Sequence, residues 1–147
     1  MGRIKMRIST RSRYGLRAVV ELAIEGRPML LKEISGRLKV SMKYLDHIFS
    51  SLKRAGIIRS IKSHSGYVLS KRPSKIKAID VIKALEGLSF VDCIESPQIC
   101  NRAGSCATQV LWKRLKGVVE KILDISIKEL ADIQRKLNVR SKNMYYI

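Results

Sequence analysis

The sequence predicts a mainly α-helical fold with one small β-hairpin and a long helix toward the C-terminus. Apolar residues recur at helical spacing in most segments of the 147 residues, and the period changes to that of short strands only between residues 57 and 69. With 46% apolar and 5% aromatic residues, the chain can bury one ordinary core, or a small domain with an appended helix. A second full-sized domain does not fit.

Three helices are predicted in the first 56 residues, over 9–25, 31–38 and 42–55. Ser9 or Thr10 can cap the start of the first helix, and Ser41 is a favourable N-cap for the third. Gly26 ends the first helix and Gly56 ends the third. The second and third helices are separated only by a short turn, and helix, turn, helix is the helix-turn-helix unit.

The next stretch is predicted to be a hairpin. Isoleucines at 57, 58 and 61 lead into a polar turn, and Tyr67-Val68-Leu69 follows. A hairpin directly after a helix-turn-helix is a wing, although an isolated hairpin of this kind reads as ordinary solvated structure. A fourth helical stretch that ends at Gly87 closes the unit, so we predict a winged helix-turn-helix domain over residues 6–87.

The remaining chain is predicted to be a loop, two helices and a tail. Residues 88–106 read as a loop because they contain Pro97 and Gly104. From residue 107, an a/d seam repeats at spacings of 4, 3, 4 and 3 through Leu111, Leu115, Val118, Ile122 and Ile125. We interpret residues 107–137 as a long dimerisation helix and a terminal helix, followed by a basic tail over 138–147. The alternative for the seam is an intramolecular core helix.

The formal charge of +18 is unevenly distributed. Residues 1–75 hold 18 Lys and Arg against 4 Asp and Glu, whereas residues 76–147 hold 12 against 8. Clustered positive charge is expected of a protein that binds DNA or RNA. The alternative is a generally basic protein whose lysines serve solubility or a hot environment.

Several other classes are disfavoured. No apolar run approaches the roughly 20 residues of a membrane span, and the N-terminus lacks the apolar segment of a signal peptide, so we expect a cytoplasmic protein with no membrane partner. The two histidines, His47 and His64, lie in the helix-turn-helix and the wing. No Ser-His-Asp set, carboxylate pair or phosphate loop accompanies them, so we do not expect an enzyme.

Cys93, Cys100 and Cys106 are the only cysteines and lie within one 14-residue stretch. An odd number of cysteines in the cytoplasm favours metal or redox use over disulfides. Three thiolates are the soft ligands of iron–sulfur clusters, which makes such a cluster the expected cofactor. A zinc-stabilised nucleic-acid-binding module is an alternative, although structural zinc sites usually show closer cysteine pairs. An RNA-binding winged helix with idle cysteines is another.

Four segments carry a resemblance to a known family: MRISTRSRYGLRAVVELA, LLKEISGRLKVSMKYLDHIFSSLKRAGIIRSIKSHSGYVLS, AIDVIKALEG and CATQVLWKRL. In this order they resemble the Rrf-two family of winged-helix transcriptional regulators, typified by IscR, NsrR and CymR. The resemblance implies a homodimer that binds a palindromic operator in double-stranded DNA. In members with three loop cysteines it implies an iron–sulfur cluster, for which [2Fe-2S] is favoured and [4Fe-4S] is possible. A regulator of cysteine or thiol metabolism without a cluster is the alternative within the family.

The chain departs from the family pattern at three places. The wing of the family usually carries Gly-Gly-Tyr, and Ser65 replaces the first glycine here. A histidine completes the cluster in the IscR-like branch, and Gln109 occupies that position. Other members take a ligand from the first helix, where this chain has Arg13 and Arg17, neither of which can ligate iron.

Helix geometry and the resemblance together indicate which residues contact DNA. The first turns of the third helix enter the major groove, so Met42, Lys43, Asp46 and His47 are expected to reach base edges. Arg7, Thr10, Arg11 and Lys62 are expected to contact the backbone, as is the hydroxyl of Tyr44. The further predicted DNA-binding residues are the N-cap and the wing positions: Ser41, Arg59, Ser63 and His64.

Overall fold

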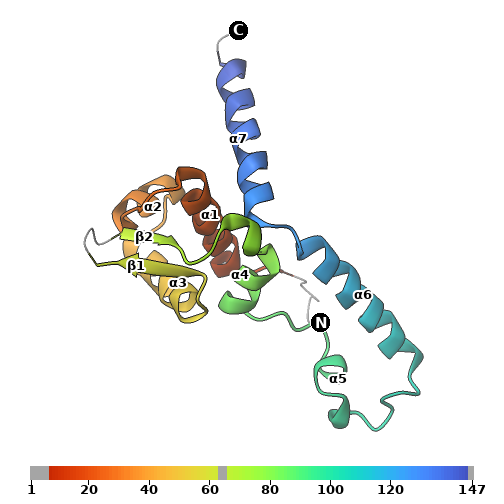
Figure 1. Ribbon diagram of the computed structural model, residues 1–147. Coiled ribbons are helices and arrows are strands. Elements are labelled where there is room, and N and C mark those ends of the chain that lie inside the picture. Colours follow the sequence, from red (N-terminus) through yellow and green to blue (C-terminus); the bar gives the residue numbers. More distant parts are fainter. Residues whose placement is uncertain (1–6, 63–65, 146–147) are drawn as a thin grey trace.

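The computed structural model describes residues 7–62 and 66–145. This part of the chain is mostly helical and contains one two-stranded antiparallel sheet, which confirms the predicted fold class. Figure 1 shows the elements, which in chain order are α1 (Thr10–Glu25), α2 (Leu31–Leu38), α3 (Met42–Arg54), β1 (Ile58–Ile61), β2 (Gly66–Leu69), η1 (Pro73–Lys75), α4 (Ala78–Leu85), α5 (Asp92–Glu95), η2 (Pro97–Ile99), α6 (Ala107–Leu123) and α7 (Ile127–Met144).

The caps that the sequence predicts for α1 and α3 are formed. The Ser9 hydroxyl accepts the N–H of Ser12 at 3.0 Å, and the Ser41 hydroxyl accepts the N–H of Tyr44 at 3.2 Å. Each satisfies a backbone donor that a helix start otherwise leaves unpaired. Between α2 and α3, Lys39 adopts a left-handed conformation with φ 54°, which ends α2 and starts the turn.

The wing is anchored at its base. Strands β1 and β2 pair in antiparallel register from Ile58 opposite Leu69 to Ile61 opposite Gly66. Met29, in the link between α1 and α2, exchanges two backbone hydrogen bonds with Tyr67 of β2, at 3.1 and 2.9 Å. The hairpin is therefore fixed to the domain through β2. Its turn, residues 63–65, lies outside the described residues.

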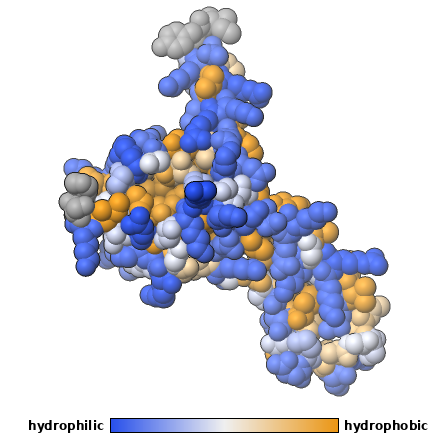
Figure 2. Space-filling model, viewed as in Figure 1, coloured by the Kyte–Doolittle hydropathy of each residue, from blue (hydrophilic) through white to orange (hydrophobic). Residues whose placement is uncertain are grey.

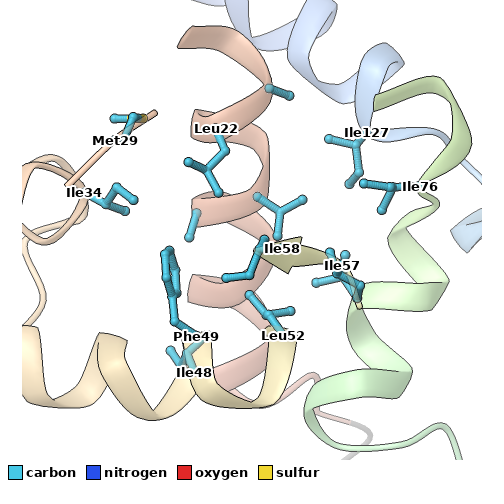
Figure 3. Packing of buried hydrophobic residues seen from close by; sticks show 14 of the residues in the cluster. Leu22, Met29, Ile34, Ile48, Phe49, Leu52, Ile57, Ile58, Ile76 and Ile127 are labelled. Atoms are coloured by element: carbon cyan, nitrogen blue, oxygen red, sulfur yellow. The ribbon is translucent and has the colours of Figure 1, made fainter. Parts of the chain in front are cut away.

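One hydrophobic core holds α1–α4, β1 and the start of α7 together. Figure 3 shows labelled side chains of α1, α2, α3, β1 and α7 converging on it, together with Ile76 just before α4. Phe49 of α3 is fully buried and its ring meets the Tyr67 ring edge-on, with 4.8 Å between centroids. Burying one large apolar side chain contributes about 1.5–3 kcal/mol, so this cluster determines how α3 and the wing are held.

The start of α7 completes this core. The Ile127 N–H donates to the Ile76 carbonyl, and the Ala78 N–H donates to the Ile125 carbonyl, both at 2.9 Å. These bonds place the buried side chains of Ile127 and Ala131 against α1 and α4. The predicted terminal helix is therefore present. It continues to Met144 instead of ending at residue 137, because 138–144 contains no glycine or proline to stop it.

The segment predicted as a loop, 88–106, contains two short helical turns, α5 and η2. Pro97 is the first residue of η2, a position that tolerates its missing N–H, so the same proline that indicates a loop starts a turn here. Helix α6 follows and extends away from the core domain, as does the outer half of α7 (Figure 1). Among the described residues, no helix is long and apolar enough to cross a membrane.

Candidate nucleic-acid interface and cysteine segment

Helix α3 separates its side chains into a buried and an exposed face. Its buried residues are Leu45, Ile48, Phe49 and Leu52. The four side chains predicted to reach base edges, those of Met42, Lys43, Asp46 and His47, are all exposed. Core packing on one face thus leaves the predicted reading residues together on the other. Ser41 is exposed as well, and its hydroxyl oxygen is used in the cap.

The start of α1 lies beside α3 on the same side of the domain. Tyr44 is half-buried and meets Tyr14 of α1 edge-on, with ring centroids 6.3 Å apart. The guanidinium of Arg11 donates to the Ser51 hydroxyl of α3. Arg7 and Thr10 are exposed at the beginning of α1.

The described part of the wing presents two of the predicted contacts. Arg59, opposite Val68 in the sheet, and Lys62, after the end of β1, are both exposed. Ser63 and His64 lie outside the described residues. The wing therefore brings at least two cations to the domain surface, both carried on or beside β1.

Carboxylates are gathered away from these cations. Residues 1–75 contain four of them, and three, Glu21, Glu25 and Glu33, surround Arg27 and Arg37 on α1 and α2. The shortest contacts, both 2.6 Å, join Arg37 to Glu25 and Arg27 to Glu33. Among the described residues, no ion pair involves the predicted DNA-binding cations Arg7, Arg11, Lys43, Arg59 and Lys62. Their positive charge is therefore uncompensated.

A pocket that the sequence analysis did not predict lies between α1 and α3, with a volume of about 450 Å³. It is lined mainly by Arg11, Tyr44, His47, Ser50, Ser51 and Arg54, and we refer to it as the α1–α3 pocket. The spacing of positions 44, 47, 51 and 54 is the signal that identifies these residues, because steps of three and four place side chains on one side of a helix.

The three cysteines are free and half-buried. No group of three or more His, Cys, Asp or Glu side chains within the described residues is arranged to hold a metal ion. The chemistry of three thiols suits a soft metal centre, but this arrangement of the segment does not bring them together.

Cys106 differs from an ordinary thiol. It is the residue before α6, and its Sγ lies 3.1 Å from the Thr108 hydroxyl. That hydroxyl, followed by the N–H groups of Gln109 and Thr108, lowers the pKa of the Cys106 thiol. Hydrogen bonds to the charged form favour it, so Cys106 is biased toward the thiolate, the form that ligates metals and reacts with oxidants.

Gln109, the residue at the expected ligand position, has a structural role. Its side chain is 5% exposed, and it is the one buried residue of α6. Its Oε1 accepts the N–H of Gly104 at 3.1 Å, and its Nε2 donates to the Cys93 carbonyl at 3.1 Å. A second tie, a 2.9 Å ion pair between Lys116 and Glu95, fixes α5 to α6. Both ends of the cysteine segment are thus fastened to α6.

The apolar seam of α6 is not part of the core. Leu111, Val118 and Ile122 are 55–69% exposed, whereas Leu115 and Ile125 are half-buried. Figure 2 shows hydrophobic side chains among hydrophilic ones over the α5–α6 region. Most of this seam is therefore exposed in the single chain, whereas an intramolecular core helix would bury it.

Comparisons with known proteins agree with this geometry. A family model described as Rrf2, iron-dependent transcriptional regulator, matches residues 8–133. Protein rrf2 of Nitratidesulfovibrio vulgaris is 34% identical over 143 residues, covering 94% of this chain and 93% of the relative. The structure of CymR, the global cysteine regulator of B. subtilis, matches with a TM-score of 0.72 and 36% identity, over 87% of this chain and 98% of that one. IscR of T. potens matches with a TM-score of 0.68 and 30% identity, over 90% and 91%.

This chain is therefore similar to these relatives in both sequence and fold over nearly their whole length. They are transcriptional regulators, not enzymes, which confirms that expectation from the sequence. With its exposed α3 face, its wing and its uncompensated cations, the chain belongs to the Rrf2 family of DNA-binding transcriptional regulators.

Proposed function

We propose that the chain is a homodimeric, cytoplasmic regulator that binds a palindromic operator in double-stranded DNA, with one winged helix on each half-site. The observation that carries this proposal is the outward face of α3, where Met42, Lys43, Asp46 and His47 are exposed above a buried apolar face. A helix in the major groove reads bases with such a face, and a flanking wing contacts the backbone or the minor groove.

Dimerisation is supported by the seam of α6. Three of its apolar side chains are more than half exposed, and the contacts of α6 with its own chain are chiefly with α4 and α5. Pairing two such seams removes them from water, at about 25 cal/mol per Å² of apolar surface. A pair of winged helices then presents two α3 helices to a two-fold symmetric site.

Charges placed in the seam test this part of the proposal. The variant with Leu115→Asp and Ile122→Asp is expected to be monomeric by light scattering and to bind DNA far more weakly, because two carboxylates would be buried in the interface. Lys113→Asp is the matched control, since it places the same charge on the exposed opposite side of α6. If the double variant stays dimeric, the seam is not the interface.

We further propose that DNA binding is controlled by an iron–sulfur cluster held by Cys93, Cys100 and Cys106. The three thiols in one segment, the lowered pKa of Cys106 and the iron-dependent description of the family support this. When bound, such a cluster supplies a redox-active and chemically labile centre. Gln109 and the Glu95–Lys116 pair would connect any change in the segment to α6.

A second candidate is a thiol-responsive regulator that holds no cluster. The observation in its favour is that the described residues place no three metal-ligating side chains together, and that Gln109 already satisfies both ends of its amide with backbone partners. The likeness to CymR, described as a global cysteine regulator, points the same way.

Anaerobic reconstitution with iron and sulfide, followed by analysis of both elements, separates the two candidates. The cluster proposal predicts equimolar iron and sulfide bound to the protein and their loss in the variant with Cys100→Ser. Ser105→Ala, in the same segment, is the control and should leave the content unchanged. Protein that takes up no sulfide favours the second candidate, and one zinc per chain without sulfide contradicts the cluster.

A further inference from the structure

The α1–α3 pocket carries two cations and no carboxylate. Arg11 reaches it from α1, and Arg54 reaches it from the last turn of α3. Within the described residues, neither arginine forms an ion pair. Two uncompensated guanidinium groups around one hollow favour an anion there.

One side of the pocket is already ordered. Arg11 is half-buried, and its guanidinium donates to the Ser51 hydroxyl, which holds it beside α3. Tyr44, whose ring packs against Tyr14, and His47 add further polar hydrogens to the lining. A guanidinium held in place loses little freedom when its remaining N–H groups bind an anion, so the pocket is prepared for a ligand with several acceptor oxygens.

We infer that this pocket binds one phosphodiester of the DNA backbone in each half-site, with Arg11 and Arg54 as the two charged contacts. The inference rests on the proposed DNA binding, and it adds Arg54 to the residues that are predicted to contact DNA. His47 lines the pocket and also belongs to the exposed face of α3, so a strand whose bases face Lys43 and His47 passes its backbone beside the pocket. Such a contact fixes the register of α3 in the groove.

Salt dependence of DNA binding tests the inference on the full chain. The ligand is a duplex that the wild-type protein enriches from a random-sequence pool. Arg54→Ala is expected to reduce the slope of log affinity against log salt by about one per half-site, or about two per dimer. Arg13→Ala is the matched control, because it removes the same charge from an exposed position on α1 that does not line the pocket.

A neutral methylphosphonate moved along the backbone identifies the phosphate. At one position in each half-site it should weaken wild-type binding by about tenfold or more, since it removes a charge-assisted hydrogen bond. At that position it should have little further effect on Arg54→Ala. Arg54→Lys keeps the charge but loses the planar guanidinium that can donate two parallel hydrogen bonds. Its salt slope should therefore remain near that of the wild type while its affinity for DNA falls.

Three results would overturn the inference. Equal slopes of log affinity against log salt for Arg54→Ala and Arg13→Ala would show that Arg54 does not contact the phosphate. A methylphosphonate effect that persists in Arg54→Ala would show the same. Inorganic phosphate that binds the wild type through Arg54, observed by NMR at constant ionic strength, without any effect of Arg54→Ala on DNA affinity, would assign the pocket to a free anion. A wild-type chain that binds no duplex would instead contradict the proposed function itself.

Discussion

Two neighbouring residues of α3 illustrate how one helix serves two purposes. Leu45 is fully buried and holds the helix to the core, whereas Asp46, the next residue, is fully turned to the outside. This alternation follows from helical spacing alone, which is why the sequence was sufficient to predict the exposed set. Whether each exposed side chain reads a base or contacts a phosphate depends on the DNA, and it remains a prediction.

Substitutions separate these two roles. Lys43→Ala is expected to relax discrimination at one base pair by about 1–3 kcal/mol, because a base-edge contact differs between sequences. Lys62→Ala should weaken binding about equally on all sequences and flatten the salt dependence. Selection from a random pool with each variant measures both effects. An unchanged consensus with Lys43→Ala would show that Lys43 does not read the operator.

Gln109 shows how a single residue can differ from its expected role. The position suggests a ligand, but the side chain donates to the Cys93 carbonyl and accepts from the Gly104 N–H. These partners lie 16 and 5 residues away along the chain and are backbone groups. No sequence pattern encodes them, because they depend on how the segment folds back onto α6.

Loss of this tie should loosen the cysteine segment. Gln109→Ala leaves two backbone groups without their partners, so we expect faster hydrogen exchange in residues 93–106 and an unchanged winged helix domain. Gln98→Ala, an exposed glutamine in the same segment, is the control. Equal exchange rates in both variants would show that Gln109 does not hold the segment.

At the scale of elements, α7 connects the core domain to the C-terminal part of the chain. Ile127 is fully buried in the shared core, while Ile133, less than two turns along the helix, is 47% exposed. Ile127→Ala is expected to lower the free energy of unfolding by about 2–5 kcal/mol, because it leaves a cavity. Ile133→Ala should cost much less. Urea denaturation measures both, and equal losses would contradict the placement of α7.

Helices α1 and α2 are joined by the cluster of Arg27 and Arg37 with three glutamates. The hydrogen bond from Arg37 lowers the pKa of Glu25 below its ordinary value of 4.5. A carboxyl with a lowered pKa in the folded state stabilises the fold above pH 4.5, and this stabilisation is lost as the pH falls through the lowered pKa.

Arg37→Ala should therefore reduce stability at pH 7 and make it less dependent on pH below 4.5. Urea midpoints measured from pH 3 to pH 7 test this. Arg114→Ala removes an exposed arginine of α6 that forms no ion pair among the described residues, and it should leave the profile unchanged. If the urea midpoints of Arg37→Ala depended on pH as those of the wild type do, this cluster would not be the reason that stability falls at low pH.

Most elements were predictable because their signals are local. Ser9 and Ser41 as caps, Gly26 as a stop and the change of period near residue 57 determine α1, α3 and the wing. The predicted end of the terminal helix at residue 137 was wrong, since nothing there interrupts a helix and α7 continues to Met144. The two turns within 88–106 were missed because three- or four-residue helices show no periodicity.

At the scale of the whole molecule, charge and apolar surface are separated. Uncompensated cations collect on α1, α3 and β1, three of the four carboxylates of residues 1–75 collect on the α1–α2 side, and exposed apolar side chains follow α6. Helix α6 extends away from the winged helix domain (Figure 1), so pairing through α6 leaves the DNA-facing surfaces free. We therefore expect substitutions on the DNA-facing surface to weaken DNA binding without affecting the proposed dimer.

The central claim, two winged helices on one symmetric site, is tested most directly by one selection experiment with a mass measurement. The wild-type chain is bound to random-sequence duplexes, the enriched sequence is determined, and the mass of the complex is measured by light scattering. The proposal predicts a two-fold symmetric consensus, half-sites separated by a whole number of helical turns, and two chains per duplex. One chain on an asymmetric consensus, or no enriched sequence at all, would contradict it.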